Sequence, residues 1–326
     1  MTEPNELQAL LTLLEGASSI LLICHVSPDG DTLGSALALR ERLLRMGKAV
    51  ELGVDGDVPY NCRMLPEWQS VQKPEDCKAC ELALCVDVSS PDRMGAMQLL
   101  FDASRKTALI DHHPTNPAFA GRSVIDGDAP ATALVVWRMF RMQKLALTQS
   151  EAVNLYAALS TDTGNFVYES TNSECFLMMS ELMQAGLPLA HYSRLLFRQK
   201  ALPFVRLLAL SLSTLEVSAD GRLAGLSVMQ EQLASAGATA DHTDGLVDYA
   251  IDLDGVRLAY FLREGADGTV KASLRALEPY RVDQVASGFG GGGHRLAAGC
   301  TLHMSMPKAR EAIKTALTKA QSEVSE

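Results

Sequence analysis

Residues 19–31 read Ser-Ile-Leu-Leu-Ile-Cys-His-Val-Ser-Pro-Asp-Gly-Asp, a short apolar run that gives way to a polar turn. Beyond the turn, leucines recur at helical spacing from Leu33 to Leu44, and Gly47 stands where a glycine commonly ends a helix. Together these features predict a strand, a turn and a helix in succession.

The same alternation of apolar runs and helical stretches continues as far as residue 185. Apolar runs span 49–54, 82–88 and 108–110, and helix-like stretches span 129–142, 149–159 and 173–185. Short apolar strands that alternate with helices are typical of an open sheet of parallel strands with helices on both faces. We therefore predict an α/β protein whose N-terminal domain, residues 1–186, is a doubly wound, mostly parallel sheet.

The pattern changes after Gly186. A basic and apolar segment follows, which predicts a linking helix over residues 187–210. Beyond it, apolar runs pair across two Ala-Asp-Gly turns, at 219–221 and 266–268, as they do in β-hairpins. We expect a smaller α+β domain with a mixed sheet over residues 211–326.

The composition fits a globular protein of two domains. The chain has 326 residues, 47% of them hydrophobic, which is ample for buried cores and excludes a disordered or fibrous protein. Its 39 acidic residues outnumber the 29 basic ones, and the formal net charge is -10. Proteins that hold long duplex nucleic acid through its phosphates need a basic surface, so this class is excluded.

We expect a cytoplasmic protein with no membrane partner. The N-terminus has no basic region before an apolar stretch, and no run of 18 apolar residues occurs that would span a membrane. The seven cysteines are an odd number and lack the spacing of a disulfide framework, which favours a reducing compartment. The sequence leaves both a monomer and a homodimer open.

Histidine and aspartate side chains stand where the predicted strands end. The carboxyl ends of the strands in an open α/β sheet form one ligand-binding edge. Acids that converge there repel one another unless a cation neutralises them, and mixed imidazole and carboxylate ligands suit Mn²⁺ or another first-row ion. For each motif alone, a helix cap or a turn is the alternative. The side chains are His25, Asp29, Asp31, Asp87, the triplet Asp111-His112-His113, and Asp162 after a helical stretch.

The order and spacing of these motifs resemble the DHH phosphoesterase superfamily. Farther along, a glycine-rich segment resembles the signature of the DHH-associated domain. Together with a strand segment in which polar and apolar residues alternate, it resembles the branch of the superfamily whose members are both oligoribonucleases and pAp phosphatases. The resemblance spans residues 18–302 and implies a metal-dependent phosphoesterase. The matching segments are His25-x-x-x-Asp29-x-Asp31, Asp87, Asp111-His112-His113, Asp162, Lys271-x-Ser273-x-Arg275 and Gly290-Gly-Gly-Gly-His294-Arg-Leu-Ala-Ala-Gly299.

The resemblance implies two Mn²⁺ ions, with Mg²⁺ or Co²⁺ as substitutes and Asp87 as the bridging ligand. Two ions about 3.5–4 Å apart clamp the attacking and leaving oxygens of an in-line phosphoryl displacement. His113 would face the phosphate as a catalytic residue, and Asp111 would orient a histidine rather than bind metal. One ion would be held by His25, Asp29 and Asp87, and the second by Asp31, Asp87, His112 and Asp162.

The C-terminal motifs imply the substrate contacts. Side chains that alternate along a strand face one side together, and a glycine run exposes backbone N–H groups to a phosphate. For the glycine run alone a flexible loop is the better explanation, but its place after a helical pattern and before Ala-Ala-Gly favours ligand binding. For the strand a solvated face is the better explanation from the residues alone, and the resemblance reverses that preference. The expected substrate-binding residues are Lys271, Ser273, Arg275, Gly291, Gly292, Gly293, His294, Arg295 and, on a loop of the first domain, Arg93.

The resemblance therefore implies an enzyme that cleaves short single-stranded RNA to mononucleotides and removes the 3′-phosphate of pAp, 3′-phosphoadenosine 5′-phosphate. The alternatives are a cyclic- or linear-dinucleotide phosphodiesterase, an inorganic pyrophosphatase or exopolyphosphatase, and an inactive nucleotide-binding regulator. An inactive regulator would lack metal ligands, whereas every expected ligand is present in this sequence.

Overall fold

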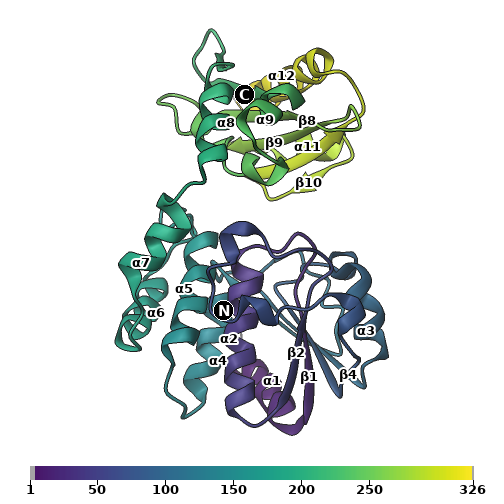
Figure 1. The fold of residues 1–326 in the computed structure, drawn as a ribbon, viewed down its shortest axis with the longest axis vertical. Helices are drawn as coiled ribbons and strands as arrows, with labels where there is room; N and C mark the ends of the chain where they lie inside the picture. Colours follow the sequence, from purple (N-terminus) through teal and green to yellow (C-terminus); the bar gives the residue numbers. More distant parts are fainter. Residues whose placement is uncertain (1–3, 325–326) are drawn as a thin grey trace. The chain divides into compact units, whose positions relative to one another are not determined.

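The computed structural model describes residues 4–324, which divide between Gln199 and Lys200 into two compact units (Figure 1). Each unit is built around one β-sheet with helices packed against it. The predicted α/β class is confirmed: the first sheet is parallel throughout and the second is mixed.

The first sheet is doubly wound, as predicted. The chain passes from β1 to β2 on one side and then returns to place β3 on the other side of β1. This change of direction creates a switch point beside the carboxyl ends of β1 and β3, where open α/β sheets bind ligands. In the order β2-β1-β3-β4-β5, the strands are β1 (Ser19–Ile23), β2 (Ala49–Gly53), β3 (Leu82–Val86), β4 (Lys106–Asp111) and β5 (Arg122–Ile125).

Two apolar cores cover the two faces of this sheet. Side chains alternate along each strand, so Leu22 and Leu84 lie in one core, and Leu21 and Ala83 lie in the other. Strand β3 is buried along its whole length, as expected for a central parallel strand. The helices of this unit are α1 (Pro4–Gly16), α2 (Gly30–Arg45), α3 (Gln98–Ala103), α4 (Thr132–Met142), α5 (Gln149–Asp162), α6 (Ser173–Gln184) and α7 (Leu189–Ser193).

Helices α2 and α5 pack closely because Gly34 lies between them. A Cβ atom at Gly34 would lie only 2.4 Å from the carbonyl oxygen of Asn154 on α5. Near the start of α2, Gly30 faces Thr161 in the last turn of α5 in the same way. The two helices are therefore antiparallel, which brings the start of α2 and the end of α5 to the same end of the unit.

The second sheet is mixed, because β7 and β8 are parallel and their other neighbours are antiparallel. Both predicted hairpins are present, as the pairs β6–β7 and β8–β9. In the order β10-β11-β9-β8-β7-β6, the strands are β6 (Glu216–Val217), β7 (Leu223–Val228), β8 (Leu258–Glu264), β9 (Val270–Ala276), β10 (Gly292–Gly293) and β11 (Ala297–Leu302).

Helices cover both faces of the second sheet. Leu258 and Tyr260 pack on one side with Ile313 of the C-terminal helix, whereas Ala259 and Phe261 pack on the other. The helices are α8 (Leu202–Leu212), α9 (Gln230–Ala236), α10 (Asp248–Ile251), α11 (Asp283–Gly288) and α12 (Met306–Val324).

Short helical segments complete the fold. A π-helical turn at Arg194–Arg198 follows α7, and the segment we expect to be a linking helix, residues 187–210, is broken between this turn and α8. Pro203 lies in the first turn of α8, where a proline is tolerated. The 3₁₀ turns are Tyr60–Cys62, Trp68–Ser70, Pro74–Asp76, Pro91–Met97 and Ala240–Thr243.

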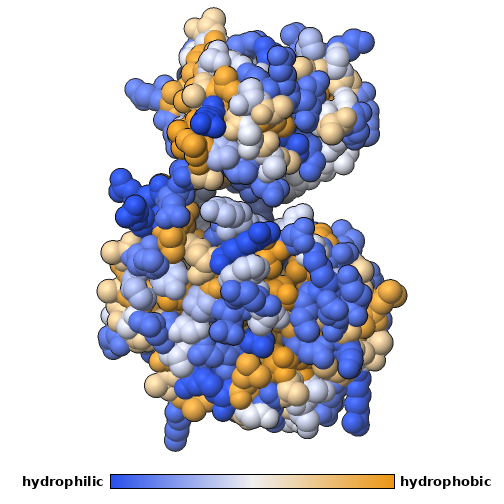
Figure 2. Space-filling model, in the orientation of Figure 1, coloured by the Kyte–Doolittle hydropathy of each residue, from blue (hydrophilic) through white to orange (hydrophobic). Residues whose placement is uncertain are grey.

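The surface is mixed in character. On the face of the first unit drawn in Figure 2, hydrophobic residues form small groups among hydrophilic ones. Among the described residues, no helix has the length and apolar character that crossing a membrane requires.

Candidate metal centre

The loop after β1 carries the first two candidate ligands. Asp29 is the N-cap of α2, and its Oδ1 accepts hydrogen bonds from the backbone N–H groups of Asp31 and Thr32. Its other oxygen, Oδ2, lies 3.5 Å from Nε2 of His25. The helix cap and the candidate ligand are therefore the same side chain, with one oxygen for each task.

Asp87 lies between two histidines at the end of β3. Its backbone φ is +60°, a left-handed conformation that aspartate tolerates better than most residues, and it turns the carboxylate into the sheet edge. Oδ2 lies 3.7 Å from Nε2 of His25, and Oδ1 lies 3.6 Å from Nε2 of His112. The hydroxyl of Thr132 on α4 donates to Oδ1 at 2.9 Å and holds the carboxylate in this orientation.

His112 faces two further carboxylates. Its Nε2 lies 3.2 Å from Oδ2 of Asp162, the last residue of α5, and 4.0 Å from Oδ2 of Asp31. Its Nδ1 lies 3.1 Å from the carbonyl oxygen of Ala129, which accepts an Nδ1–H hydrogen bond. That hydrogen bond leaves Nε2 as the ring nitrogen on the side of the acids, where a cation would take the place of its proton.

Asp31 has a structural task that its sequence does not indicate. Helix α4 begins without a side-chain cap of its own, and the carboxylate of Asp31 takes that place. Its two oxygens accept backbone hydrogen bonds from Thr132 at 2.6 Å and from Ala133 at 3.0 Å, and a third from the Ser35 hydroxyl. The positive end of the α4 dipole therefore points at the centre of the acidic cluster.

These side chains form three overlapping groups, each with its donor atoms within 4.8 Å of one another. The donors are imidazole nitrogens and carboxylate oxygens, a set that suits a divalent first-row cation. The groups are His25, Asp29 and Asp87; Asp31, His112 and Asp162; and Asp87, His112 and His113.

The electrostatics of the cluster also fit a cation. Burial raises the pKa of Asp31 well above its ordinary value, and repulsion from Asp162 adds to the shift. Burial likewise raises the pKa of Asp87, with further repulsion from Asp31. Burial opposes the charged form of His112, but its hydrogen bond to Asp162 and the nearby acids raise its pKa to about 9. Without a metal ion, the cluster therefore binds protons that offset its negative charge. A divalent cation would take the place of these protons.

Asp111 is fully buried and uses its carboxylate for hydrogen bonds. Oδ1 accepts from the backbone N–H of His112 and from Nδ1 of His113, both at 2.8 Å, and Oδ2 accepts from Nδ2 of Asn116. Burial would raise the pKa of Asp111, but these donors, His113 first, hold it below its ordinary value. Asp111 belongs to none of the three ligand groups. Sequence reasoning missed Asn116 altogether.

Arg93 touches a candidate ligand. Its Nη2 lies 2.9 Å from Nδ1 of His25, and the same Nδ1 lies 2.9 Å from the carbonyl oxygen of Val26. A guanidinium only donates and a carbonyl only accepts. In either tautomer of His25, Nδ1 can therefore bond to only one of these two partners. The tautomer with Nδ1–H bound to Val26 frees the Nε2 lone pair for a cation and leaves Arg93 without an acceptor on this ring.

In the second unit, the expected substrate residues of β9 share one side of the strand. Lys271 is exposed, and Ser273 and Arg275 are half-buried. Nε of Arg275 donates to Oδ1 of Asp248 on α10 at 3.1 Å. The guanidinium that we expect to bind substrate is therefore ion-paired within the unit.

The glycine run packs against β11. A Cβ atom at Gly291 would lie 2.1 Å from the carbonyl oxygen of Gly299, so only glycine fits there, and the N–H of Gly291 donates to Ala286. Gly292 has open space around its Cα atom. After the run, Arg295 pairs with Glu278 at 2.8 Å and stays half-exposed, and backbone hydrogen bonds between His294 and Ala297 close a tight turn.

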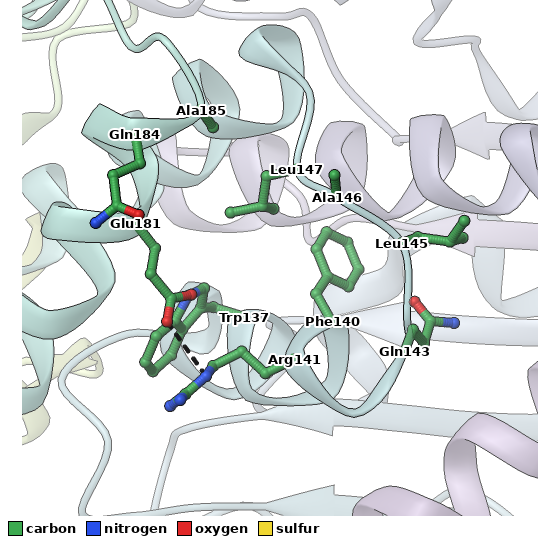
Figure 3. A pocket seen from close by; sticks show the side chains of 10 residues that line it. All are labelled: Trp137, Phe140, Arg141, Gln143, Leu145, Ala146, Leu147, Glu181, Gln184 and Ala185. Carbon is green, nitrogen blue, oxygen red and sulfur yellow. Dashed lines mark hydrogen bonds and ion pairs between the residues drawn. The ribbon is translucent and has the colours of Figure 1, made fainter.

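The pocket drawn in Figure 3 lies elsewhere in the first unit. It has a volume of about 330 Å³ and lies between the C-terminal part of α4, the connection to α5, and α6. The side chains of Trp137 and Phe140 on its floor are buried, and the ion pair of Arg141 with Glu181 lies at its edge (Figure 3). None of the candidate metal ligands lines it.

Comparison with known proteins gives the family. A model described as the N-terminal domain of the DHH family matches residues 19–159, and a DHHA1 domain model matches residues 225–326. The bifunctional oligoribonuclease and PAP phosphatase NrnA of Thermus thermophilus is 32% identical over 320 residues, which cover 95% of this chain and 93% of the relative.

Two further similarities are more distant. The cyclic-di-AMP phosphodiesterase PdeA of Listeria monocytogenes is 25% identical over 88% of this chain and 45% of its own length. The crystal structure of an exopolyphosphatase-related protein from Bacteroides fragilis matches 100% of this chain and 99% of its own, with a TM-score of 0.95 and 25% identity. On the matched domains and the extent of identity, the chain belongs to the DHH family of phosphoesterases, with a DHH domain followed by a DHHA1 domain.

Proposed function

We propose that this protein hydrolyses short single-stranded RNA oligonucleotides to mononucleotides and removes the 3′-phosphate of pAp, with two Mn²⁺ ions as cofactors. The relative from Thermus thermophilus carries both activities in its name and aligns over nearly the whole of both chains. We place the activity in the cytoplasm, where the seven cysteines, all free in the structure, stay reduced.

The position of Asp87 carries the proposal. Its two carboxylate oxygens face different histidines, so one side chain contributes to two ligand groups. His25, Asp29 and Asp87 would hold one cation, and Asp31, Asp87, His112 and Asp162 the other. When bound, two divalent cations supply Lewis acidity and an acidified water molecule for attack on phosphorus.

The remaining groups of the first unit act on the phosphate. Asp111 accepts the Nδ1–H of His113 and so fixes the ring orientation, which directs Nε2 at one defined point. We assign the doubly protonated form of His113 to donate its Nε2–H to the phosphate oxygens as negative charge develops on them. Once His25 donates to Val26, the guanidinium of Arg93 is available for a second phosphate oxygen.

The DHHA1 unit supplies groups that recognise a nucleotide. Lys271, Ser273 and Arg275 present two cations and a hydroxyl along one side of β9. His294 and Arg295 follow the glycine run, in which Gly292 and Gly293 lie at the edge of the sheet beside β11. Gly291 fits this role less well, because its N–H already donates to Ala286.

The proposal is tested by product release from purified protein with and without Mn²⁺. The substrates are the dinucleotide pApA, pAp, inorganic pyrophosphate and cyclic di-AMP, and the Asp87→Ala protein serves as a blank for contaminating nucleases. We expect Mn²⁺-dependent release of AMP from pApA and of phosphate from pAp, with little turnover of pyrophosphate. Inactivity of the wild-type protein on both pApA and pAp would overturn the assignment.

A cyclic-dinucleotide phosphodiesterase is the second candidate. The similarity to PdeA over 88% of this chain favours it. The same metal centre serves either substrate, so the difference lies in binding. A kcat/KM for cyclic di-AMP above that for pApA would establish this alternative.

A further inference from the structure

Asn116 connects the two loops that carry the centre of the candidate site. One hydrogen of its Nδ2 amide donates to the carbonyl oxygen of Val88 at 2.8 Å, and the other donates to Oδ2 of Asp111 at 2.5 Å. Val88 follows Asp87 at the end of β3, and Asp111 ends β4. Both amide hydrogens are therefore used to hold one strand end against the other.

The Asp111 carboxylate is oriented by the backbone N–H of His112 on Oδ1 and by Asn116 on Oδ2. Rotation about the terminal torsion of an aspartate is soft, so neighbouring hydrogen bonds decide where its two oxygens point. Because Asn116 holds Oδ2, Oδ1 remains 2.8 Å from Nδ1 of His113. The orientation of the His113 ring thus depends on a residue whose side-chain hydrogen bonds reach none of the three ligand groups.

The position requires an amide rather than a carboxylate. The Oδ1 atom of Asn116 accepts from the backbone N–H of Ala118, which fixes the side chain so that Nδ2 faces two acceptors. An aspartate here keeps the size and the bond to Ala118, but it sets an oxygen against the oxygens of Val88 and Asp111. Two donated hydrogen bonds then become two repulsive contacts in a partly buried site.

We propose that Asn116 is a positioning residue of the phosphoesterase site, which acts through Asp111 to orient His113. This inference rests on the role that the proposed function gives to His113. Asn116 itself makes no contact with the reacting phosphate in this assignment. Its contribution is to the turnover of bound substrate rather than to binding.

The test compares Asn116→Asp with the wild type on pAp and on bis(p-nitrophenyl) phosphate. We expect kcat to fall by about 10- to 100-fold, as for other orienting partners, with KM and the Mn²⁺ affinity unchanged within about twofold. In a His113→Ala background the same substitution should change kcat by less than about twofold, because the two residues act in one pathway. Asn172→Asp is the matched control, since Asn172 caps α6 only as an acceptor, and it should leave kcat unchanged.

Three kinetic or binding results would overturn the inference. The first is an unchanged kcat in Asn116→Asp, the second is an equal loss of kcat when the substitution is made in the His113→Ala background, and the third is a loss of Mn²⁺ affinity that matches the loss of kcat. A measurement independent of turnover is the imidazole ¹H–¹⁵N spectrum, in which wild-type His113 should show an Nδ1–H that is hydrogen-bonded to Asp111. A His113 spectrum in Asn116→Asp identical to the wild type also overturns it. If the wild type cleaves bis(p-nitrophenyl) phosphate but neither pApA nor pAp, the proposed substrates fail while the comparison of variants stands.

Discussion

Asp87 and His112 come from adjacent strands and approach to 3.6 Å between Oδ1 and Nε2, while the other Asp87 oxygen lies 3.7 Å from Nε2 of His25. The carboxylate is 2% exposed, and its backbone adopts a left-handed conformation. A buried acid that lies between two imidazoles, with its carboxylate held by the Thr132 hydroxyl, has a geometry suited to bridging two cations.

Replacement of Asp87 should therefore disable both cation sites at once. We expect Asp87→Ala to reduce kcat by about 10³-fold or more at saturating Mn²⁺, since the bridging ligand holds both ions in register. The number of tightly bound ions per chain, measured by elemental analysis after dialysis, should fall from two to at most one. Near-normal activity at saturating Mn²⁺ would show that Asp87 does not bridge.

The matched control for this prediction is Asp102→Ala. Asp102 is an exposed aspartate on α3 that belongs to none of the ligand groups. Its removal changes the net charge by the same amount and should leave both the ion count and kcat unchanged.

The pKa of His112 predicts opposite effects of pH on stability and on metal affinity. In the metal-free folded protein the pKa of His112 is raised from 6.5 to about 9, so between these values the folded state binds more protons than the unfolded chain. The free energy of unfolding should then fall as pH rises from 6.5 to about 9. The pKa values of Asp31 and Asp87, raised above 3.8 by burial, likewise lower the free energy of unfolding as pH rises above 3.8. A cation needs the unprotonated Nε2, so its affinity should rise over the same window.

Urea unfolding of chelator-treated protein, at several pH values in this window, measures the free energy of unfolding. Titration with Mg²⁺ at the same pH values measures the cation affinity. His112→Asn should flatten the stability profile, because asparagine does not titrate. Metal-free stability that rises between neutral pH and pH 9 would contradict the assigned protonation of His112.

Much of the fold of the first unit could be predicted from the spacing of apolar residues, because strands and helices alternate regularly there. The runs at 49–54 and 82–88 correspond to β2 and β3, and the stretch 149–159 to α5. Helix α1 and strand β5 were not predicted. Strand β5 is an edge strand of four residues with a single fully buried side chain, Val124, so its sequence carries almost no apolar signal.

The candidate ligands were predictable because they follow strands, whereas their hydrogen-bonding partners were not. Asp31 and Thr132 are 101 positions apart in sequence, yet the backbone of one helix is capped by the carboxylate of another. The link from Asn116 to Val88 likewise depends on the order of the strands. Such contacts are set by tertiary structure, and a single sequence has no local pattern for them.

The ion pair of Arg275 with Asp248 predicts opposite effects of two substitutions on substrate binding. Arg275→Ala should raise the KM for pAp by about tenfold, since a hydrogen bond to a charged phosphate is lost. Asp248→Asn should lower it by about two- to threefold, because the half-exposed carboxylate no longer competes for the guanidinium. Steady-state kinetics with pAp measure both. An unchanged kcat/KM in Arg275→Ala would remove Arg275 from the site.

A buried ion pair at the other end of α2 should support the fold without affecting catalysis. Glu151 is fully buried and accepts from Nε and Nη2 of Arg42, from Arg45, and from the backbone N–H of Thr148. Glu151→Gln leaves the buried Arg42 without its counter-charge, so the free energy of unfolding should fall by about 3 kcal/mol.

The fluorescence of Trp68 and Trp137 reports the unfolding of the first unit in urea, because both tryptophans of the chain lie there. The matched acid-to-amide control is Asp57→Asn, which breaks the exposed pair with Lys73 and should leave the urea midpoint unchanged. We expect the kcat of Glu151→Gln, measured well below its unfolding temperature, to equal that of the wild type, because Glu151 lies near the opposite end of α5 from Asp162. Equal midpoints for Glu151→Gln and the wild type would show that the buried pair does not stabilise the unit.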